Sequence, residues 1–437
     1  MHFLRADHDL QRHSYYADTA VRDAEHAALV GDARCDVAVV GGGLAGLSAA
    51  IALADRGLSV RLLEAGQIGG GASGRNGGQA IHGLACDIVT IEAQLGRDAA
   101  RDVFDMTIEA LDLIRQRCQR FNIDADWRDG YLGVATSPAK ARQLWADADH
   151  LAEQYGYPLT RIAAADLPGW IASPRYQAAV HDPRSGHLHP LKYTRGLARA
   201  AVSLGVVLHE NTPVRRLDAG PQVVLHTDGG CVRARQVLLA GNVYLPGLAP
   251  QLAPALAARI MPVGTYIVAT EPVPAAVARQ LIPCGAAVCD NNLVLDYFRF
   301  LPDHRLLYGG RVSYSTRTPR DMAVSLQRRL AGTFPSLKQL PISHAWGGFV
   351  DITMNRAPDF GRLPGAPQVY YLQGFSGHGL ALTGLAGQLV AEAMTGDSHR
   401  FDTFARLRHR RFPGGPRLRT PTLVLGMAWH RLKDALA

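Results

Sequence analysis

The chain of 437 residues lacks several features that mark particular classes of protein. It contains no run of eighteen apolar residues, so we predict no membrane-spanning helix. The start, residues 1–16, has no apolar segment of the kind found in secretory signals, which favours a cytoplasmic location. With 47% hydrophobic residues, the chain is long enough to bury the cores of two domains. We expect residues 1–34, which are polar and irregular, to form a leader over the surface.

Cysteine is scarce. The chain has six cysteines, and none of them forms a C-x-x-C pair or a zinc-finger spacing. Six cysteines in a chain of this length do not make a disulfide framework. We therefore expect reduced thiols and no metal site built on cysteine.

Lysine is scarcer still, because only four of the 46 basic residues are lysines. The formal net charge is +8, but the arginines are spread along the chain and most have acidic neighbours in the sequence. Only residues 406–419 form a dense basic stretch. We predict solvated surface charge and no nucleic-acid partner. The apolar tail, residues 421–429, is short, so we expect it to pack on its own domain rather than on a membrane.

The clearest local pattern begins at residue 35. The apolar run Cys35–Val40 predicts a buried parallel strand, and a glycine motif, Gly41-x-Gly43-x-x-Gly46, follows it at once. An alanine-rich helix (47–56) and a second strand (59–64) that ends in an acid then complete a βαβ unit. This order predicts a dinucleotide site, in which the glycines allow a tight turn, close approach of a pyrophosphate and close helix packing. The terminal acid, Glu64, is expected to accept hydrogen bonds from a ribose.

A second glycine-rich loop, Gly71–Gly78, favours FAD over NAD. An extended FAD needs a backbone cradle beyond its pyrophosphate, and this loop offers many N–H groups, one guanidinium and one amide. Farther along, we predict amphipathic helices at 91–120 and 139–155 and a helix at 381–394. The predicted strands are 205–214, 222–240, 262–271, 285–300, 305–313 and 369–373.

At these residues the chain resembles the D-amino-acid-oxidase (glycine/sarcosine oxidase) family of flavoproteins. The likeness continues in family order over nearly the whole chain, through Gly186–Pro190, Ala240–Tyr244, Ala357–Gly361 and Gln373–Gly379. It implies an α/β fold with a Rossmann-like FAD-binding domain (glutathione-reductase-like, split in sequence) and an α+β substrate domain with a large antiparallel sheet. We assign residues 1–90, 183–250 and 341–437 to the FAD domain and residues 91–182 and 251–340 to the substrate domain.

The resemblance also implies which residues contact FAD. Some family members attach FAD to a cysteine shortly before the position of Ala357, and this chain has none at 351–356, so we expect dissociable FAD. A helix that starts near Gly379 would place its positive N-terminal end at the flavin O2 position. The expected contacts are Gly41, Gly43, Leu44, Ala45, Gly46, Glu64, Ala65, Gly71, Ala72, Ser73, Arg75, Asn76, Gly77, Gly78, Gln79, Val214, Ala240, Gly241, Gly377, His378 and Gly379.

For the substrate side we select four residues of the second half of the chain. Tyr297 and Arg299 alternate with Asp296 on a predicted strand and so share one face, where they could hold a carboxylate and an alkyl chain. A surface ion pair beside a core aromatic fits this pattern equally well. Arg311 falls near a position where sarcosine-oxidase relatives carry an oxygen-activating lysine. Trp346 is expected either to wall the pocket or to lie in the core.

His187 and His189 also alternate, but no cysteine or acid cluster accompanies them, so we predict no metal site. We expect the segment that contains them to be a loop that leads into a helix at Pro190.

A narrower likeness, to the branch of the family that oxidises gamma-glutamylputrescine, rests on motifs outside the generic cofactor loops. They include Ser14–Tyr16, Ser73–Gln79, Leu295–Arg299, Tyr308–Gly310 and Phe412–Gly415. The implied activity is oxidation of an amine C–N bond by hydride transfer to flavin N5, giving aldehyde, ammonia and hydrogen peroxide. A D-amino acid, glycine or a secondary amine like sarcosine is the alternative substrate class, and an RNA-modifying flavoprotein is an alternative of another kind. The expected partners are a small amine and oxygen or another electron acceptor, and the oligomeric state stays open.

Overall fold

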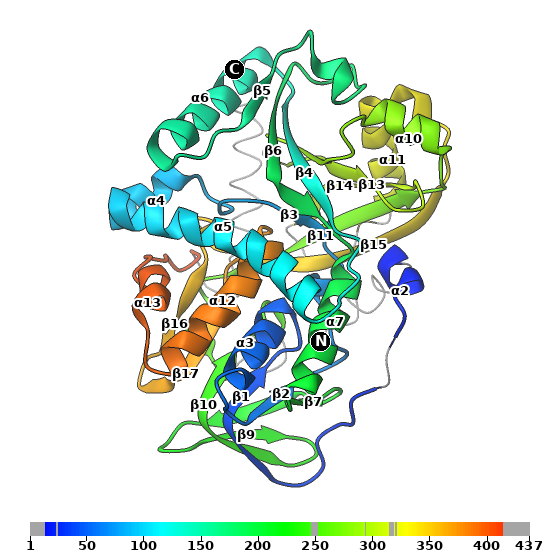
Figure 1. The fold of residues 1–437 in the computed structure, drawn as a ribbon. Helices are drawn as coiled ribbons and strands as arrows, with labels where there is room; N and C mark the ends of the chain where they lie inside the picture. Colours follow the sequence, from blue (N-terminus) through cyan, green and yellow to red (C-terminus); the bar gives the residue numbers. More distant parts are fainter. Residues whose placement is uncertain are drawn as a thin grey trace.

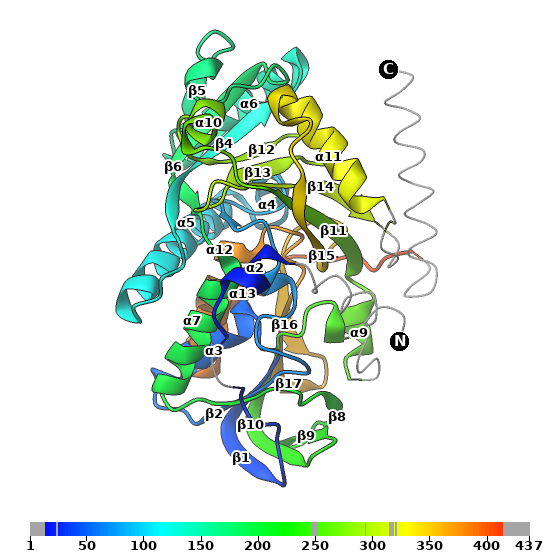
Figure 2. The same cartoon turned by 90° about the vertical axis from the view of Figure 1, so that its right-hand side faces the viewer.

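A computed structural model describes residues 14–22, 25–245, 252–292, 294–313, 319 and 321–413 of the chain. Its strands form two sheets that lie one above the other, with long helices between and around them (Figures 1 and 2). This arrangement has the α/β character and the large second sheet that the sequence predicts. All six cysteines are free.

The lower sheet of Figure 1 has a parallel centre in the order β17-β10-β1-β2-β7. Its strands come from three stretches of the chain that are far apart in sequence, as the prediction of a split domain requires. Antiparallel strands β16, β9 and β8 extend it. The strand bounds are β1 Ala33–Val40, β2 Val60–Leu63, β7 Val207–His209, β8 Val214–Asp218, β9 Val223–Thr227, β10 Cys231–Leu239, β16 Asp359–Leu363 and β17 Ala366–Gln373.

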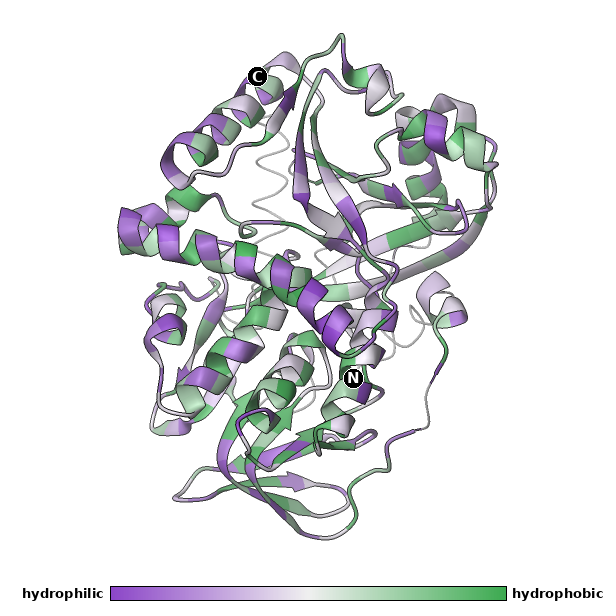
Figure 3. Ribbon diagram, in the orientation of Figure 1, coloured by the Kyte–Doolittle hydropathy of each residue, from purple (hydrophilic) through white to green (hydrophobic). Residues whose placement is uncertain are grey.

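Two apolar helices, α3 (Leu44–Ala54) and α12 (Gly379–Met394), pack against each other beside this sheet (Figure 3). They approach closely because of Gly387, where a Cβ atom would lie 2.5 Å from the backbone nitrogen of Ala49. Every residue of α3 except Ala54 is buried. Such all-round apolar character explains why the sequence of α3 shows little helical periodicity.

The upper sheet is mainly antiparallel, in the order β15-β11-β14-β13-β12-β4-β6-β3, with β5 paired to β6. Strands β4 and β6 have no counterpart among the predicted elements, and the predicted strand at 285–300 is two strands, β12 and β13. The bounds are β3 Gln79–Ala80, β4 Arg128–Ala135, β5 Thr160–Ile162, β6 Ala178–His187, β11 Met261–Thr270, β12 Ala287–Asp290, β13 Tyr297–Phe300, β14 Leu306–Ser313 and β15 Ile342–Ile352.

The predicted helix at 91–120 is in fact two helices, because Gly96 adopts a φ of 83° and ends the first. No helix in the described ranges is long and apolar enough to cross a membrane. The remaining helical bounds are α2 Tyr15–Thr19, η1 Ala72–Gly74, α4 Ile88–Leu95, α5 Arg97–Arg120, α6 Pro138–Tyr155, η2 Leu167–Gly169, α7 Pro190–Ser203, α9 Pro254–Ala257, α10 Ala275–Leu281, α11 Met322–Thr333, η3 Pro335–Leu337 and α13 His399–Ala405.

Two features of the fold bear on the predicted domain organisation. The predicted boundaries remain a prediction, but β3 and β15 are strands of the upper sheet, paired with β6 and β11, although both lie in segments assigned to the FAD domain. The expected surface leader is wrong for its middle part, because Tyr15 and Tyr16 of α2 are buried. Their aromatic rings pack against apolar residues of the upper sheet. The polar residues around them in the sequence give no indication of this burial. The predictions for the basic stretch beyond residue 413 and for the apolar tail lie outside the described residues.

Candidate active site

A cavity of about 460 Å³ opens where the parallel strands of the lower sheet end. The first βα turn, the glycine-rich loop and the ends of β2 and β10 surround it. More than half of the predicted cofactor contacts line it: Gly41, Gly43, Leu44, Ala45, Glu64, Ala65, Gly71, Ala72, Ser73, Val214, Ala240 and Gly241.

Two of the three motif glycines are fixed by close backbone approaches. Gly41 has a φ of 116°, and a Cβ atom there would lie 2.6 Å from the carbonyl oxygen of Ala240, just after β10. At Gly46 a Cβ atom would lie 2.0 Å from the carbonyl oxygen of Gly41. Both positions therefore require glycine, and α3 can start directly against the turn. At Gly43 the nearest atom is a side-chain atom, Oγ of Ser73, 2.7 Å from a Cβ atom.

The start of α3 presents donors to the cavity. The Leu44 N–H donates to Oγ of Ser73 at 2.9 Å, while the N–H groups of Ala45 and Gly46 have no acceptor among the described residues. Unpaired N–H groups at a helix N-terminus are the usual site for a phosphate. Glu64 lies beside this turn and accepts the N–H of Gly42 at 2.7 Å. Its burial raises the pKa of Glu64 despite that bond.

The predicted contacts Arg75–Gly78 are not among the residues that line the cavity, and two carbonyl groups of this part of the loop are bound by side chains of the upper sheet. Trp346 Nε1 donates to the carbonyl of Arg75 at 3.0 Å, and Arg299 Nε donates to the carbonyl of Gly77 at 2.9 Å. The amide of Asn76 donates to the Ala72 carbonyl at 3.0 Å. The N–H groups of Asn76 and Gly77 accordingly have no acceptor in the described chain. A peptide segment whose carbonyls are bound from behind is a suitable backbone cradle for a ligand.

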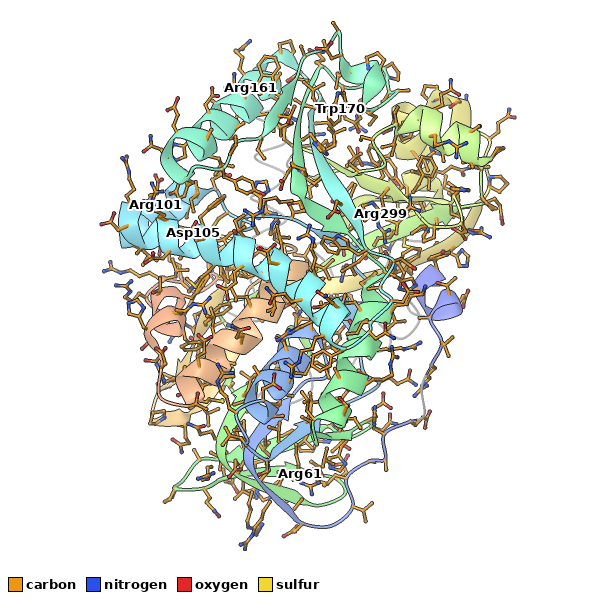
Figure 4. The ribbon with its side chains drawn as sticks, in the orientation of Figure 1. Arg61, Arg101, Asp105, Arg161, Trp170 and Arg299 are labelled. Carbon is orange, nitrogen blue, oxygen red and sulfur yellow. The ribbon has the colours of Figure 1, made fainter. Side chains whose placement is uncertain are left out.

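Arg299 differs from its expected role as a carboxylate anchor. Its side chain is 2% exposed and donates to the carbonyls of Gly77 and Leu188, the Tyr16 hydroxyl and Nδ1 of His187 (Figure 4). With four neutral acceptors in contact, this guanidinium is part of the frame behind the loop. The sequence predicts that Arg299 and Tyr297 share one face of their strand, but it does not show that backbone carbonyls contact that face.

The other substrate-side predictions have separate outcomes. Tyr297 packs against the loop, since a Cβ atom at Gly77 would lie 2.7 Å from its ring. Trp346 is fully buried, in line with the core alternative. Arg311 belongs to β14, but its side chain is outside the described part of the structure. Gln79, predicted to contact FAD, instead donates from its amide to the Val288 carbonyl at 3.1 Å.

At the turn before α12, the residues that line the cavity are not the ones predicted to contact FAD. Phe375 and Thr383 line it, whereas Gly377, His378 and Gly379 lie next to it. Nε2 of His378 donates to the carbonyls of Ile81 and His82, at 3.2 and 3.0 Å, which fixes the ring against the segment after β3. Its burial lowers the pKa of His378 to about 4, so the ring is neutral.

Sequence reasoning missed Asp351, which lines the cavity from the end of β15. Its side chain accepts the Gly374 N–H and is 1% exposed. Burial raises the pKa of Asp351 to about 7. The only available signal was an acid between apolar residues in Val350-Asp351-Ile352, which also fits an ordinary edge strand.

The two histidines near Pro190 have different partners, and the segment is not a loop as predicted, since β6 runs to His187. Nε2 of His187 donates to the Gly285 carbonyl at 3.1 Å. His189 is the N-cap of α7 and accepts the Lys192 N–H at 3.2 Å. Burial lowers the pKa of both rings to about 3, and the Arg299 charge contributes.

Comparison with known proteins decides what kind of site this is. The model of the family described as "DAO: FAD dependent oxidoreductase" matches residues 36–393. The chain belongs to this family. It is an FAD-dependent oxidoreductase, as the sequence motifs imply.

Several relatives can be compared with this flavoenzyme along their whole length. It is 42% identical to gamma-glutamylputrescine oxidoreductase of Escherichia coli (strain K12) over 97% of this chain and 98% of that protein. It is 37% identical to a probable oxidoreductase, OrdL, of Haemophilus influenzae, over 96% and 97% of the two chains. The crystal structure of glycine oxidase from Geobacillus kaustophilus has the same fold, with a TM-score of 0.72, 24% identity and coverage of 86% and 100%.

The cavity of the flavoenzyme fits FAD. The unpaired N–H groups at the start of α3 suit the pyrophosphate, and the Glu64 carboxyl suits a ribose. Beyond them, Asn76 and Gly77 have N–H groups without an acceptor in the described ranges, and Gly77 contacts Tyr297 and Arg299 of the upper sheet, so these N–H groups could hold another part of the cofactor. Phe375, just before α12, and Thr383, the fifth residue of the helix, line the same cavity, so the N-terminal end of that helix is available to the ring.

Proposed function

We propose that this flavoenzyme oxidises a carbon–nitrogen bond of gamma-glutamylputrescine or a closely related acylated polyamine. The observation that carries the proposal is the extent of the similarity to the Escherichia coli gamma-glutamylputrescine oxidoreductase. That similarity covers 97% of this chain and therefore extends beyond residues 36–393, the family match, on both sides. Segments outside the family match, α2 among them, thus fall within the span that aligns with an enzyme whose name states this substrate.

In the proposed reaction the protein binds and orients, and the cofactor supplies the redox chemistry. When bound, FAD would supply the acceptor for a hydride from the carbon that bears the amine and the route by which two electrons, with two protons, convert oxygen to hydrogen peroxide. The resulting imine loses its nitrogen to water as ammonia and leaves an aldehyde. The cavity contributes Glu64 and the α3 N-terminus at the nucleotide end, and the α12 N-terminus at the other end.

Among the described side chains, the contacts of the arginines beside the cofactor loop favour a substrate without a carboxylate next to the reacting carbon. A carboxylate next to the reacting carbon requires a cation close to the flavin. The two buried arginines beside the loop, Arg75 and Arg299, donate to backbone carbonyls, at Gly347 and Gly77 among others. An acylated polyamine carries its carboxylate far from the reacting carbon and needs no such cation at the ring.

We further propose that FAD is held without a covalent bond, since Asp351–Arg356 contains no cysteine. Oxygen is the proposed acceptor, and the cytoplasm, with its reduced thiols, is the proposed location. An RNA-modifying role has weak support: a tRNA-modifying relative, from Idiomarina loihiensis, is 25% identical over only half of this chain.

The test is anaerobic reduction of the bound flavin by a panel of amines. The panel contains gamma-glutamylputrescine, putrescine, spermidine, glycine, sarcosine and several D-amino acids, and loss of the oxidised flavin band is followed. We expect fast bleaching by gamma-glutamylputrescine and slow or no bleaching by the others. Readmitted air should restore the band and yield hydrogen peroxide. Bleaching by a small amino acid alone would refute the substrate and leave the fold and cofactor unaffected.

A further inference from the structure

The carbonyl groups of the cofactor loop are held by two buried side chains of the upper sheet. Trp346 of β15 binds the Arg75 carbonyl at 3.0 Å, and Arg299 of β13 binds the Gly77 carbonyl at 2.9 Å. These bonds clamp the Arg75–Asn76 peptide and the Gly77–Gly78 peptide. Both side chains are within 2% of complete burial, so water does not compete for the carbonyls.

A single residue of the N-terminal segment contacts both clamps. The Tyr16 hydroxyl accepts a hydrogen bond from Arg299 Nη2 at 3.1 Å. Its ring meets the Trp346 ring edge to face, with centroids 5.4 Å apart and planes at 69°. Tyr16 is 0% exposed, so it fills the space between the two clamps.

The N-terminal segment is itself tied down. Nδ1 of His189 accepts the Lys192 N–H, and its burial keeps the ring neutral, so Nε2 carries the proton and donates to Thr19 Oγ1 at 3.0 Å. Arg195 Nη1 donates to the Ala20 carbonyl at 2.7 Å. Both anchors lie on or next to α7, which also packs against the loop at η1. Because α2 is anchored at its C-terminal end, it can hold Tyr16 in one position.

The positive charge of Arg299 makes the loss of any one of its hydrogen-bond acceptors costly. No carboxylate pairs with it among the described residues, and its four acceptors are neutral. Nε2 of His187 donates to the Gly285 carbonyl, so Nδ1 is the acceptor that Arg299 meets. Loss of one acceptor leaves a buried charged donor unsatisfied, and such a donor costs more than a neutral one. The guanidinium would then turn, and the Gly77 carbonyl would turn with it.

We propose that the segment Ser14–Ala20 is a brace that fixes the cofactor loop Arg75–Gly78 through Tyr16, and that Tyr16 is a positioning residue for the bound flavin. This segment precedes residue 36, where the family match begins. The brace therefore lies outside the part of the chain that the family match covers. The inference concerns FAD and does not depend on the amine that the enzyme oxidises.

The test compares two conservative variants of the same helix in the oxidised holoenzyme, without substrate. Tyr16→Phe removes only the hydroxyl that Arg299 binds, and Tyr15→Phe is the matched control, since no hydrogen bond joins Tyr15 to Arg299. The readouts are the visible circular dichroism of the bound flavin and the rate at which FAD is released, followed by its fluorescence. Thermal unfolding of the backbone is measured in parallel.

We expect Tyr16→Phe to change the visible dichroism and to speed FAD release about tenfold, while Tyr15→Phe matches the wild type in both. Trp346→Phe, which removes the bond to the Arg75 carbonyl, should give the same signature. With gamma-glutamylputrescine, the rate of flavin reduction should fall more than the amine affinity. Wild-type flavin signals in Tyr16→Phe, or a lower unfolding temperature without a change in the flavin signals, would overturn the proposal. If Tyr16→Phe fails to fold, wild-type flavin signals in Trp346→Phe would overturn it.

Discussion

Replacement of Gly46 by alanine tests the cofactor site at its tightest contact. A Cβ atom at this position would lie 2.0 Å from the Gly41 carbonyl oxygen and 3.2 Å from Cγ1 of Val39. Normal contact between such atoms requires more than 3 Å, so the start of α3 would have to move by roughly 1 Å. The obstacle is backbone, which cannot rotate out of the way as the end of a side chain can.

The size of the effect follows from the cost of overpacking, typically about 1–3 kcal/mol. The same displacement separates the free N–H groups of α3 from the phosphate position. Because about 1.4 kcal/mol corresponds to a tenfold change in affinity, we expect Gly46→Ala to bind FAD at least tenfold more weakly. The assay is titration of the apoprotein with FAD, together with the flavin-to-protein ratio of the purified variant.

Gly332→Ala is the matched control. Gly332 lies in the last turn of α11, and nothing lies within 4 Å of a Cβ atom there. Alanine at this helical position should leave FAD binding unchanged and stabilise the protein by up to about 0.5–1 kcal/mol. If Gly46→Ala bound FAD as tightly as the wild type and Gly332→Ala did, the assignment of this turn to the pyrophosphate would be refuted.

Two further predictions concern buried charges. The pKa of Asp351 rises to about 7 in the folded apoprotein, so the folded state binds its proton more tightly than the unfolded state does. The wild type should therefore lose up to about 4 kcal/mol of unfolding free energy as the pH rises from about 4 to above 7. Asp351→Asn should not show this loss. Urea unfolding of both proteins at pH 5 and pH 8 checks the difference, and equal pH slopes would contradict it. Asp296 pairs with Arg175 and Arg329, each at 2.6 Å, so Asp296→Asn should cost about 2–3 kcal/mol in urea unfolding. An unchanged midpoint would count against this network, and FAD content should stay at the wild-type level.

The cofactor half of the site could be predicted from the sequence because its requirements are local. The motif glycines, the strand before them and the acid after them all lie within thirty residues, so spacing alone fixes their arrangement. Gly41, Gly46 and Glu64 accordingly meet in the structure as expected. Ser73, predicted as an FAD contact, also lines the cavity, whereas its hydrogen bond with the Leu44 N–H at the start of α3 was not predicted.

The frame behind the loop could not be predicted in this way. It joins Tyr16, Arg75, Arg299 and Trp346, which are separated by up to 330 residues in the chain. Alternation along β13 places Arg299 on one face but leaves its acceptors unknown, so a carboxylate and a backbone carbonyl are equally good candidates. The buried rings of α2 were hidden by their polar neighbours, since a five-residue helix carries no usable periodicity.

Asp351 illustrates a second limit. An acid within an apolar strand is normally exposed at an edge, and only the turn from Gly374 over its carboxyl group makes it a buried wall of the cavity. That turn follows β17 and comes to the end of β15 only in the folded protein. The position of such a residue depends on tertiary contacts that no local pattern records.

The most direct test of the proposed activity is a single turnover without oxygen, with one equivalent of gamma-glutamylputrescine per bound flavin. The account predicts complete loss of the oxidised flavin band, one ammonia and one aldehyde per flavin, and slower bleaching when the carbon that bears the amine carries deuterium. Persistence of the oxidised band with this amine, in a protein that contains its full complement of FAD, would contradict it.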